Sequence, residues 1–247
     1  MNPTVIEVQT ERGTMPVHLH QPGGDGPFPL VVLYMDGPGI RPALHGHAER
    51  LTRAGYAVAM PDLYYAFDAA DKPDVDKLAA GEGSEFGRMG AIVARVDDAE
   101  VLADTRLMLE AVPGGGDQPW GCVGFCMGGR FGLRAAEAFG EDVAVASLLH
   151  PSQLVTDKPD SPHLTLGAVD ASLYLGFGEN DHVTPLSVIP PLREQLEQHG
   201  IEFRIEVIPN ADHGFTMPGL PAYNETAAEL AWAGTLAALA DGLPAGV

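Results

Sequence analysis

The strongest chemical signal in the sequence is a cysteine among glycines. Residues 124–129 read GFCMGG, so Cys126 lies two residues after Gly124 and two residues before Gly128. This is the spacing of G-x-S-x-G, in which the central nucleophile occupies a sharp turn between a strand and a helix. Backbone N–H groups and the positive end of a helix dipole lower the pKa of a thiol at such a place. The pattern predicts that Cys126 is a nucleophile; the alternative is a buried cysteine that serves as a small hydrophobic residue.

A cysteine nucleophile needs a base, and the base needs an acid that orients it. His213 follows the predicted strand FRIEVIPN, and Asp181 follows the predicted strand segment LYLGF. Because the carboxyl ends of parallel strands meet at one edge of a sheet, we expect both side chains beside Cys126. We therefore predict His213 as the base and Asp181 as its orienting acid. A turn residue at Asp181 and a loop cap at His213 are the structural alternatives.

Alternating strand and helix patterns must position these residues. They predict an α/β fold, with a mostly parallel central sheet and helices on both faces, in one domain over residues 1–247. An N-terminal hairpin is predicted from two strands, 5–10 and 15–20. The polar segment 65–95 is interpreted as a crossover or a cover over the site, without a definite shape. The other predicted strands are 30–35, 56–62, 121–125, 143–150, 173–181 and 203–210, and the predicted helices are 45–55, 97–112, 127–140, 186–200 and 225–243.

Composition narrows the class of protein. The chain has 247 residues, 45% of them hydrophobic, and a formal net charge of −20. This charge argues against nucleic acid or an anionic membrane as a partner, although a locally basic site for a small anion is compatible with it. No stretch is typical of a signal peptide or a membrane span, so we expect a cytoplasmic protein. The two cysteines do not suggest a disulfide framework, and Cys122 is interpreted as a core residue. No pattern indicates the oligomeric state.

The segments GFCMGG, GENDHVTP and ADHGF, with PDLY at 61–64, resemble the dienelactone hydrolases, an α/β-hydrolase family with a Cys-His-Asp triad. The resemblance runs from about Val31 to the C-terminal helix. It implies the α/β-hydrolase fold and a hydrolase that cleaves a small ester or lactone through an acyl thioester on Cys126. It also implies His213 as general base and acid and Asp181 as the orienting acid. We predict no cofactor and no metal.

The same resemblance assigns further residues near the thiol. Asp36 stands where the family has a glutamate that is thought to hold the resting thiol and to take part in its activation; a plain turn aspartate is the alternative. The backbone N–H groups of Gly37 and Met127 match the oxyanion hole, where each donor stabilises the transition state by roughly 3–4 kcal/mol.

Residues that would hold the substrate depart from the family pattern. Members that act on dienelactone hold its carboxylate with arginines, one of them four residues after the histidine, where this chain has Met217. Arg88 is a candidate for another. We therefore expect that dienelactone itself is not preferred. Tyr64 and His150 follow predicted strands and are candidates for the pocket wall.

Two pairs of histidines raise the question of a metal site, and three other functions remain open. His18 and His20 share one face of a predicted strand, and a solvent-facing pair on an edge strand is favoured over a metal site. His45 and His47 are interpreted as structural or pocket-rim residues rather than as an H-x-H metal site. The functional alternatives are a thioesterase or general carboxylesterase on the same site, a non-catalytic binding protein, and a redox-sensing thiol protein.

Overall fold

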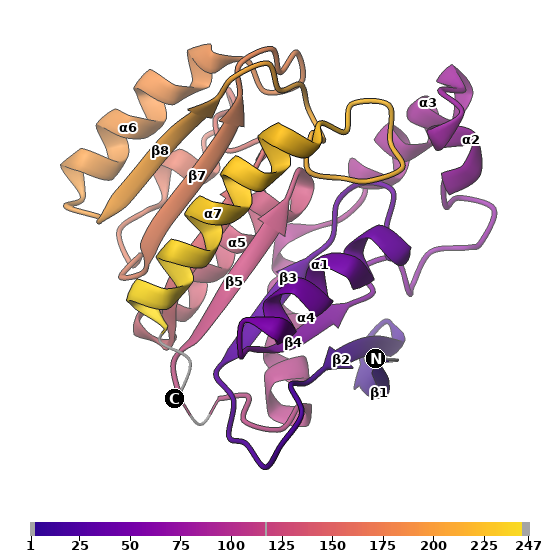
Figure 1. Ribbon diagram of the computed structural model, residues 1–247, viewed down its shortest axis with the longest axis vertical. Coiled ribbons are helices and arrows are strands. Elements are labelled where there is room, and N and C mark those ends of the chain that lie inside the picture. The colour runs from indigo at the N-terminus through magenta and orange to yellow at the C-terminus, as the bar shows by residue number, and fades with distance from the viewer. Residues whose placement is uncertain (1–2, 117, 244–247) are drawn as a thin grey trace.

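The computed structural model describes residues 3–116 and 118–243 (Figure 1). Eight strands form one sheet in the order β1-β2-β4-β3-β5-β6-β7-β8. β1 and β2 form an antiparallel hairpin, β2 pairs antiparallel with β4, and the pairs from β4 to β8 are parallel. The strands are β1 (Thr4–Thr10), β2 (Gly13–His20), β3 (Leu30–Tyr34), β4 (Ala57–Pro61), β5 (Trp120–Phe125), β6 (Val143–Leu149), β7 (Ser172–Gly178) and β8 (Phe203–Ile208).

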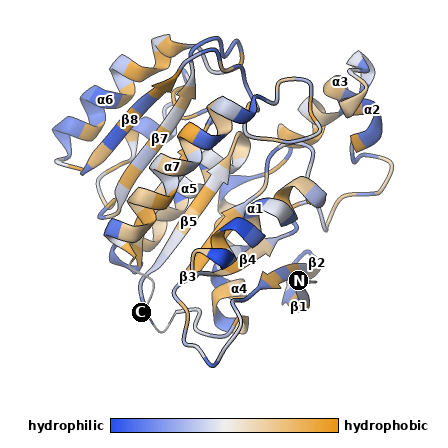
Figure 2. Cartoon of the chain, viewed as in Figure 1, coloured by the Kyte–Doolittle hydropathy of each residue, from blue (hydrophilic) through white to orange (hydrophobic). Residues whose placement is uncertain are grey.

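Helices cover both faces of the sheet. In Figure 1, α1 and α7 lie in front of the sheet, and α4 and α5 lie behind it. Both faces are therefore covered, which is why β3, β4 and β5 are continuous apolar runs that are buried along their whole length. Figure 2 shows the same division, with hydrophobic residues in the central strands and hydrophilic residues on α6 and α2. The helices are α1 (Pro42–Arg53), α2 (Val75–Ala79), α3 (Gly83–Val93), α4 (Asp98–Ala111), α5 (Met127–Phe139), α6 (Ile189–Gln198) and α7 (Glu225–Gly242).

The predicted fold class and the hairpin are confirmed, and element boundaries shift by a few residues. One such change is in α1, which begins at Pro42 rather than at residue 45. Proline suits the first turn of a helix, because its fixed φ is already helical and its missing N–H would have no partner there.

The segment 65–95, for which no shape was predicted, forms the short helices α2 and α3. The Asp74 side chain caps α2 by accepting from the Asp76 and Lys77 N–H groups. Glu85 is buried, and its carboxylate accepts from the Asp74 N–H, which joins the two helices.

The predicted solvent-facing histidine pair is wrong. β2 is an interior strand between β1 and β4, and His20 is only 4% exposed. Its Nε2 lies 3.1 Å from Nδ1 of His45 on α1, and the rings of His18 and His45 are 5.2 Å apart. The error arose because the strand order, which only tertiary pairing decides, places β1 and not β2 at the edge.

Candidate active site

Cys126 occupies a strained turn between β5 and α5. Its φ of 54° and ψ of −116° lie in a region that non-glycine residues rarely adopt. Backbone hydrogen bonds hold it there: the Cys126 N–H donates to the Leu149 carbonyl at 3.1 Å, and its own carbonyl accepts from the N–H groups of Gly129 and Ser152. The turn thus places the side chain at the end of β5 and at the beginning of α5.

The glycines around Cys126 are sterically required. A Cβ at Gly124 would overlap the carbonyl of Gly128, and a Cβ at Gly128 would overlap the carbonyl of Tyr34. The strand and the helix therefore approach so closely that neither position accepts a side chain, which is the steric role expected of glycines in such a turn.

The predicted acid and the predicted base lie within hydrogen-bond distance of each other. The Nδ1 of His213 lies 2.8 Å from Oδ2 of Asp181, and the Asp181 side chain is fully buried. The other carboxylate oxygen accepts from the N–H groups of Val183 at 2.9 Å and Thr184 at 2.7 Å. Both oxygens of Asp181 are thus fixed, and the carboxylate holds the His213 ring in one orientation.

The charges of Cys126 and His213 favour an ion pair. Burial opposes charge on both groups, but for each group the interaction with the other outweighs this cost. His213 lowers the pKa of the Cys126 thiol below its usual value. The Cys126 thiolate, together with Asp181, raises the pKa of His213 to about 10. Each group therefore favours the charged form of the other, a thiolate beside an imidazolium.

Ser152 is a site residue that sequence reasoning missed. Its hydroxyl oxygen lies 3.8 Å from Sγ of Cys126, and its N–H holds the Cys126 carbonyl. A hydroxyl donor at this place contributes to the lowered pKa of Cys126. The signal was present, because Ser152 closely follows β6 and so lies at the same edge of the sheet as Cys126.

His150, a predicted wall residue, lies beside the base but is completely buried. Its ring packs edge-on against His213 at 5.2 Å, and its Nε2 lies 2.7 Å from the Thr216 hydroxyl. Burial, with the nearby charge of His213, keeps the pKa of His150 well below the usual value. His150 is thus a neutral packing partner for His213.

Asp36 lies near the thiol but is engaged by another residue. Arg41 contacts both of its carboxylate oxygens, Nη1 with Oδ1 at 2.5 Å and Nη2 with Oδ2 at 2.8 Å, and both side chains are buried. The negative charge of Asp36 acts to raise the pKa of Cys126, which opposes the thiolate. Arg41, in the same loop and of opposite charge, was not singled out in the sequence. Its guanidinium compensates the Asp36 charge next to the thiol.

The predicted oxyanion residues lie on the two elements that flank the thiol. Met127 is the first residue of α5, so its N–H has no partner within the helix. Gly37 follows β3, and the Tyr64 hydroxyl donates to its carbonyl at 2.7 Å while lying 3.7 Å from the Met127 sulfur. A Cβ at Gly37 would lie 2.9 Å from Met89 Sδ, so this loop is tightly packed. Tyr64 thus contacts both Gly37 and Met127, the residues whose N–H groups are the candidate oxyanion donors.

The two positions considered for a substrate cation differ in their surroundings. Arg88 is on α3 with its side chain 47% exposed; it lies 3.6 Å from the Glu85 carboxylate and donates to the Ala70 carbonyl. Met217 is fully buried. Met217, at the position of the family arginine, carries no charge. The guanidinium of Arg88 is already bonded, so neither position presents a free guanidinium.

Metal-ligand clusters and membrane-spanning helices are both absent from the described residues. Across residues 3–116 and 118–243, no group of three or more His, Cys, Asp or Glu side chains is arranged to hold a metal ion, the clustered His18, His20 and His45 included. Within the same residues, no helix has the length and apolar character needed to cross a membrane.

Comparison with known proteins identifies the family of this chain. The sequence model of the dienelactone hydrolase family matches residues 15–242. A protein of Escherichia coli (strain K12) named "Putative carboxymethylenebutenolidase" is 29% identical over 239 residues, which span 91% of this chain and 82% of that protein. The carboxymethylenebutenolidase of Rhodococcus opacus is 28% identical over 236 residues, 92% of this chain and 87% of its own.

Solved structures show the same fold. A crystal structure described as "Putative Dienelactone Hydrolase" from Klebsiella pneumoniae superposes with a TM-score of 0.82 at 25% identity, over 96% of this chain and 97% of that one. Since the family model covers most of the chain, the chain belongs to the dienelactone hydrolase family and is an ester or lactone hydrolase.

Proposed function

We propose that this protein hydrolyses a small ester or lactone through a covalent acyl thioester on Cys126, with His213 as general base and acid and Asp181 as the residue that orients it. The observation that carries the proposal is the coupling of the three groups. Asp181 bonds His213 at 2.8 Å, and Cys126 and His213 shift each other's pKa in opposite directions. A packing cysteine would need neither partner.

The first half of the reaction forms the thioester. The Cys126 thiolate attacks the carbonyl carbon and forms a C–S bond, and the carbonyl electron pair moves onto oxygen. The N–H groups of Met127 and Gly37 stabilise this oxyanion. The C–O bond to the leaving group then breaks, and the His213 imidazolium gives its proton to the departing oxygen. A lactone ring opens in this step, and its hydroxyl remains attached to the acyl chain.

The second half returns the enzyme to its resting state. The neutral His213, held by Asp181, takes a proton from water as the water oxygen attacks the thioester carbon. Collapse of the second oxyanion breaks the C–S bond and releases the acid. The thiolate and the imidazolium are restored together, so one ester and one water become one acid and one alcohol. Enol leaving groups suit this cycle, since they need little help from an acid.

The charged residues near the thiol support a preference for neutral substrates. The guanidinium of Arg41 is buried and already bonded to Asp36 and to the Gly39 carbonyl. Met217 occupies the position of one family arginine, and Arg88 is bonded at the solvent-exposed side of α3. With no free cation assigned to hold a carboxylate, we propose that uncharged esters and lactones are turned over faster than dienelactone.

A substrate panel tests the nucleophile. Wild-type protein is assayed with p-nitrophenyl acetate, p-nitrophenyl butyrate, a neutral enol lactone and dienelactone, beside Cys126→Ala and the control Cys122→Ala. We expect turnover by the wild type and by Cys122→Ala, and loss of turnover in Cys126→Ala. Mass spectrometry of protein quenched during turnover should find an acyl group on the peptide that contains Cys126. Full activity in Cys126→Ala would refute the mechanism.

The ranking of the panel tests the substrate preference separately. The neutral enol lactone should have a higher kcat/KM than dienelactone, and Met217→Arg should narrow the gap by restoring a cation for the carboxylate. Efficient use of dienelactone by the wild type would overturn the preference while leaving the nucleophile in place.

A further inference from the structure

A buried hydroxyl group lies beside the candidate nucleophile, in the loop that follows β6. Ser152 is 6% exposed, and its Oγ lies 3.8 Å from Sγ of Cys126. Within residues 3–116 and 118–243, this hydroxyl forms no other hydrogen bond. Buried polar groups are normally hydrogen-bonded, so the sulfur is the atom that satisfies the Ser152 hydroxyl.

The loop that carries Ser152 has a strained backbone. The φ angles of His150 (38°) and Gln153 (58°) lie in the left-handed region, which residues other than glycine rarely adopt. Backbone hydrogen bonds hold this shape: the His150 N–H donates to the Gly176 carbonyl at 2.7 Å, and the Ser152 N–H donates to the Cys126 carbonyl at 2.9 Å. Strain of this kind is typical of functional sites, where the surrounding structure keeps a side chain in place.

The same loop packs directly on α5. A Cβ at Gly129 would lie only 2.5 Å from Cβ of Pro151, so the loop touches the first turn of the helix. The guanidinium of Arg130, on the same turn, bonds the Gln153 side chain. These contacts on both sides of Ser152 fix its hydroxyl beside the sulfur, as a preorganised site requires.

The ionisable groups around the thiol act on it through charge. Burial raises the pKa of Cys126 and the charge of His213 lowers it, but Nε2 of the His213 ring has no hydrogen-bond partner among the described residues. Both carboxylate oxygens of Asp36 are bonded to Arg41. The other ionisable groups that interact with the thiol by charge are Tyr64, after β4, and Arg130, on α5. In this structure the sulfur is therefore held by Ser152 rather than by an ionisable group.

A hydroxyl group can hold the sulfur in both of its protonation states, because it is both a donor and an acceptor. It accepts from the neutral S–H, and after ionisation it turns about its Cβ–Oγ bond and donates to the thiolate. Hydrogen bonds to an ionised partner are the stronger ones, so the contact favours the thiolate. The contribution of Ser152 to the lowered pKa of Cys126 agrees with this effect.

We propose that Ser152 is a catalytic residue, whose hydroxyl holds Sγ of Cys126 at rest and donates a hydrogen bond to the thiolate that attacks the substrate. The inference rests on the proposed function, since it assigns a further residue to the same reaction. The hydroxyl proton stays on the Ser152 oxygen throughout. The thiolate electron pair forms the C–S bond, and the hydrogen bond weakens as the negative charge moves to the oxyanion. When the C–S bond breaks, the electron pair returns to sulfur and the hydrogen bond forms again.

Alkylation with iodoacetamide over a pH series tests the contact without any substrate. In Ser152→Ala the midpoint of the rate profile of Cys126 should rise by about one pH unit, a roughly tenfold smaller thiolate fraction below the midpoint, because one hydrogen bond to a charged atom is lost. The limiting rate at high pH should not fall, because a thiolate with a higher pKa is the stronger nucleophile. The matched control Ser147→Ala, within β6, removes a buried hydroxyl that lies 2.8 Å from that of Thr235, and it should leave the midpoint unchanged.

Turnover of p-nitrophenyl acetate gives a second readout. The pH dependence of kcat/KM reports the ionisation of groups in the free enzyme. The acid limb of this profile should therefore move in Ser152→Ala by the same pH interval as the alkylation midpoint. Below that limb kcat/KM should fall about tenfold, whereas Ser147→Ala should follow the wild type.

Other outcomes would overturn the inference. An unchanged alkylation midpoint in Ser152→Ala would refute the hydrogen bond to the thiolate, and a lower limiting rate beside it would show that Ser152 only supports the loop. An equal shift in Ser147→Ala would trace the effect to β6 as a whole. The proposed function fails separately, if Cys126→Ala retains full activity, because the alkylation profiles of the wild type and Ser152→Ala need no turnover. Thermal unfolding of each variant confirms that it is folded.

Discussion

Cys122 and Cys126 are four residues apart, yet the protein places their two thiols in opposite environments. Cys122 lies within β5 and is fully buried, and burial raises the pKa of its thiol to about 12. Cys126 lies one residue beyond β5, is partly exposed, and has a pKa below the usual value because His213 faces it. Within β5 both faces of the sheet are covered. The end of β5, in contrast, lies beside groups from the ends of other strands.

The two neighbouring histidines repeat the contrast. His150 and His213 both follow strands and their rings are 5.2 Å apart, but only His213 has a carboxylate partner and a thiolate neighbour. Its pKa rises to about 10, whereas that of the fully buried His150 falls well below the usual value. In both pairs the residue type is the same, and the partners supplied by other strand ends decide the chemistry.

Removing the charge of Asp181 should have the largest effect. Asp181→Asn keeps the size of the side chain but not its charge, so His213 loses the partner that orients it and supports its imidazolium form. We expect kcat to fall by about 10³- to 10⁴-fold. Steady-state kinetics on p-nitrophenyl acetate measures this change. Asp212→Asn, at an exposed carboxylate that only caps the His213 N–H, is the control and should retain most activity.

Removing Arg41 tests the environment of Cys126. Arg41→Gln leaves the buried Asp36 without its partner, and we expect a loss of about 3–5 kcal/mol in the free energy of unfolding. The double variant Asp36→Asn/Arg41→Gln removes both charges and should recover most of it. Urea unfolding of the three proteins measures the difference. Equal stability of the single variant and the wild type would show that the pair does not matter for folding.

Alkylation sharpens the comparison of the two thiols. In the folded protein, iodoacetamide should modify Cys126 and leave Cys122 unmodified, and the reaction of Cys126 should persist below the ordinary pKa of a thiol. His213→Gln removes the imidazolium, so the rate at pH 7 should fall toward that of an ordinary thiol. Peptide mass spectrometry over a pH series measures both results. An unchanged rate in His213→Gln would contradict the ion pair.

Acid should destabilise the protein through its buried histidines, the smallest effect we predict. Burial lowers the pKa of His47 and of His20 to about 4, from 6.5 for each. The unfolded chain therefore takes up protons first as pH falls below 6.5, and stability present above this pH is lost progressively toward pH 4. The drop in Tm between about pH 7.5 and about pH 5 should be smaller in His47→Phe than in the wild type. An identical drop would show that His47 is not one of the responsible groups.

Much of the fold and the core of the candidate site could be predicted from local patterns. Apolar runs marked β3 to β7, since a strand covered on both faces must be apolar along its length. Gly124 and Gly128 marked the turn at Cys126, because the backbone crowding they relieve is local. The predicted pairing of Asp181 with His213 followed from one rule, that the carboxyl ends of parallel strands share an edge.

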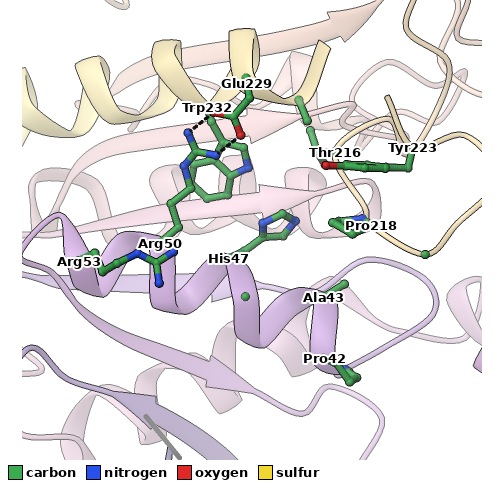
Figure 3. A pocket seen from close by; sticks show the side chains of 13 residues that line it. Pro42, Ala43, His47, Arg50, Arg53, Thr216, Pro218, Tyr223, Glu229 and Trp232 are labelled. Atoms are coloured by element: carbon green, nitrogen blue, oxygen red, sulfur yellow. Dashed lines mark hydrogen bonds and ion pairs between the residues drawn. The ribbon is translucent and has the colours of Figure 1, made fainter. Parts of the chain in front are cut away.

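Other features depended on neighbours that are distant in the chain or on the path of a loop. The contact of His45 with His20 required the strand order, and the contact of Trp232 with His47 required α7 to pack beside α1 (Figure 3). The hold of Arg41 on Asp36 required the loop to bend back on itself. The sequence by itself determined the elements and the reactive residue types, because periodicity and turn chemistry act over a few residues. Only the tertiary structure decided which thiol and which histidine are charged, because desolvation and charge pairing depend on groups brought together from several strand ends.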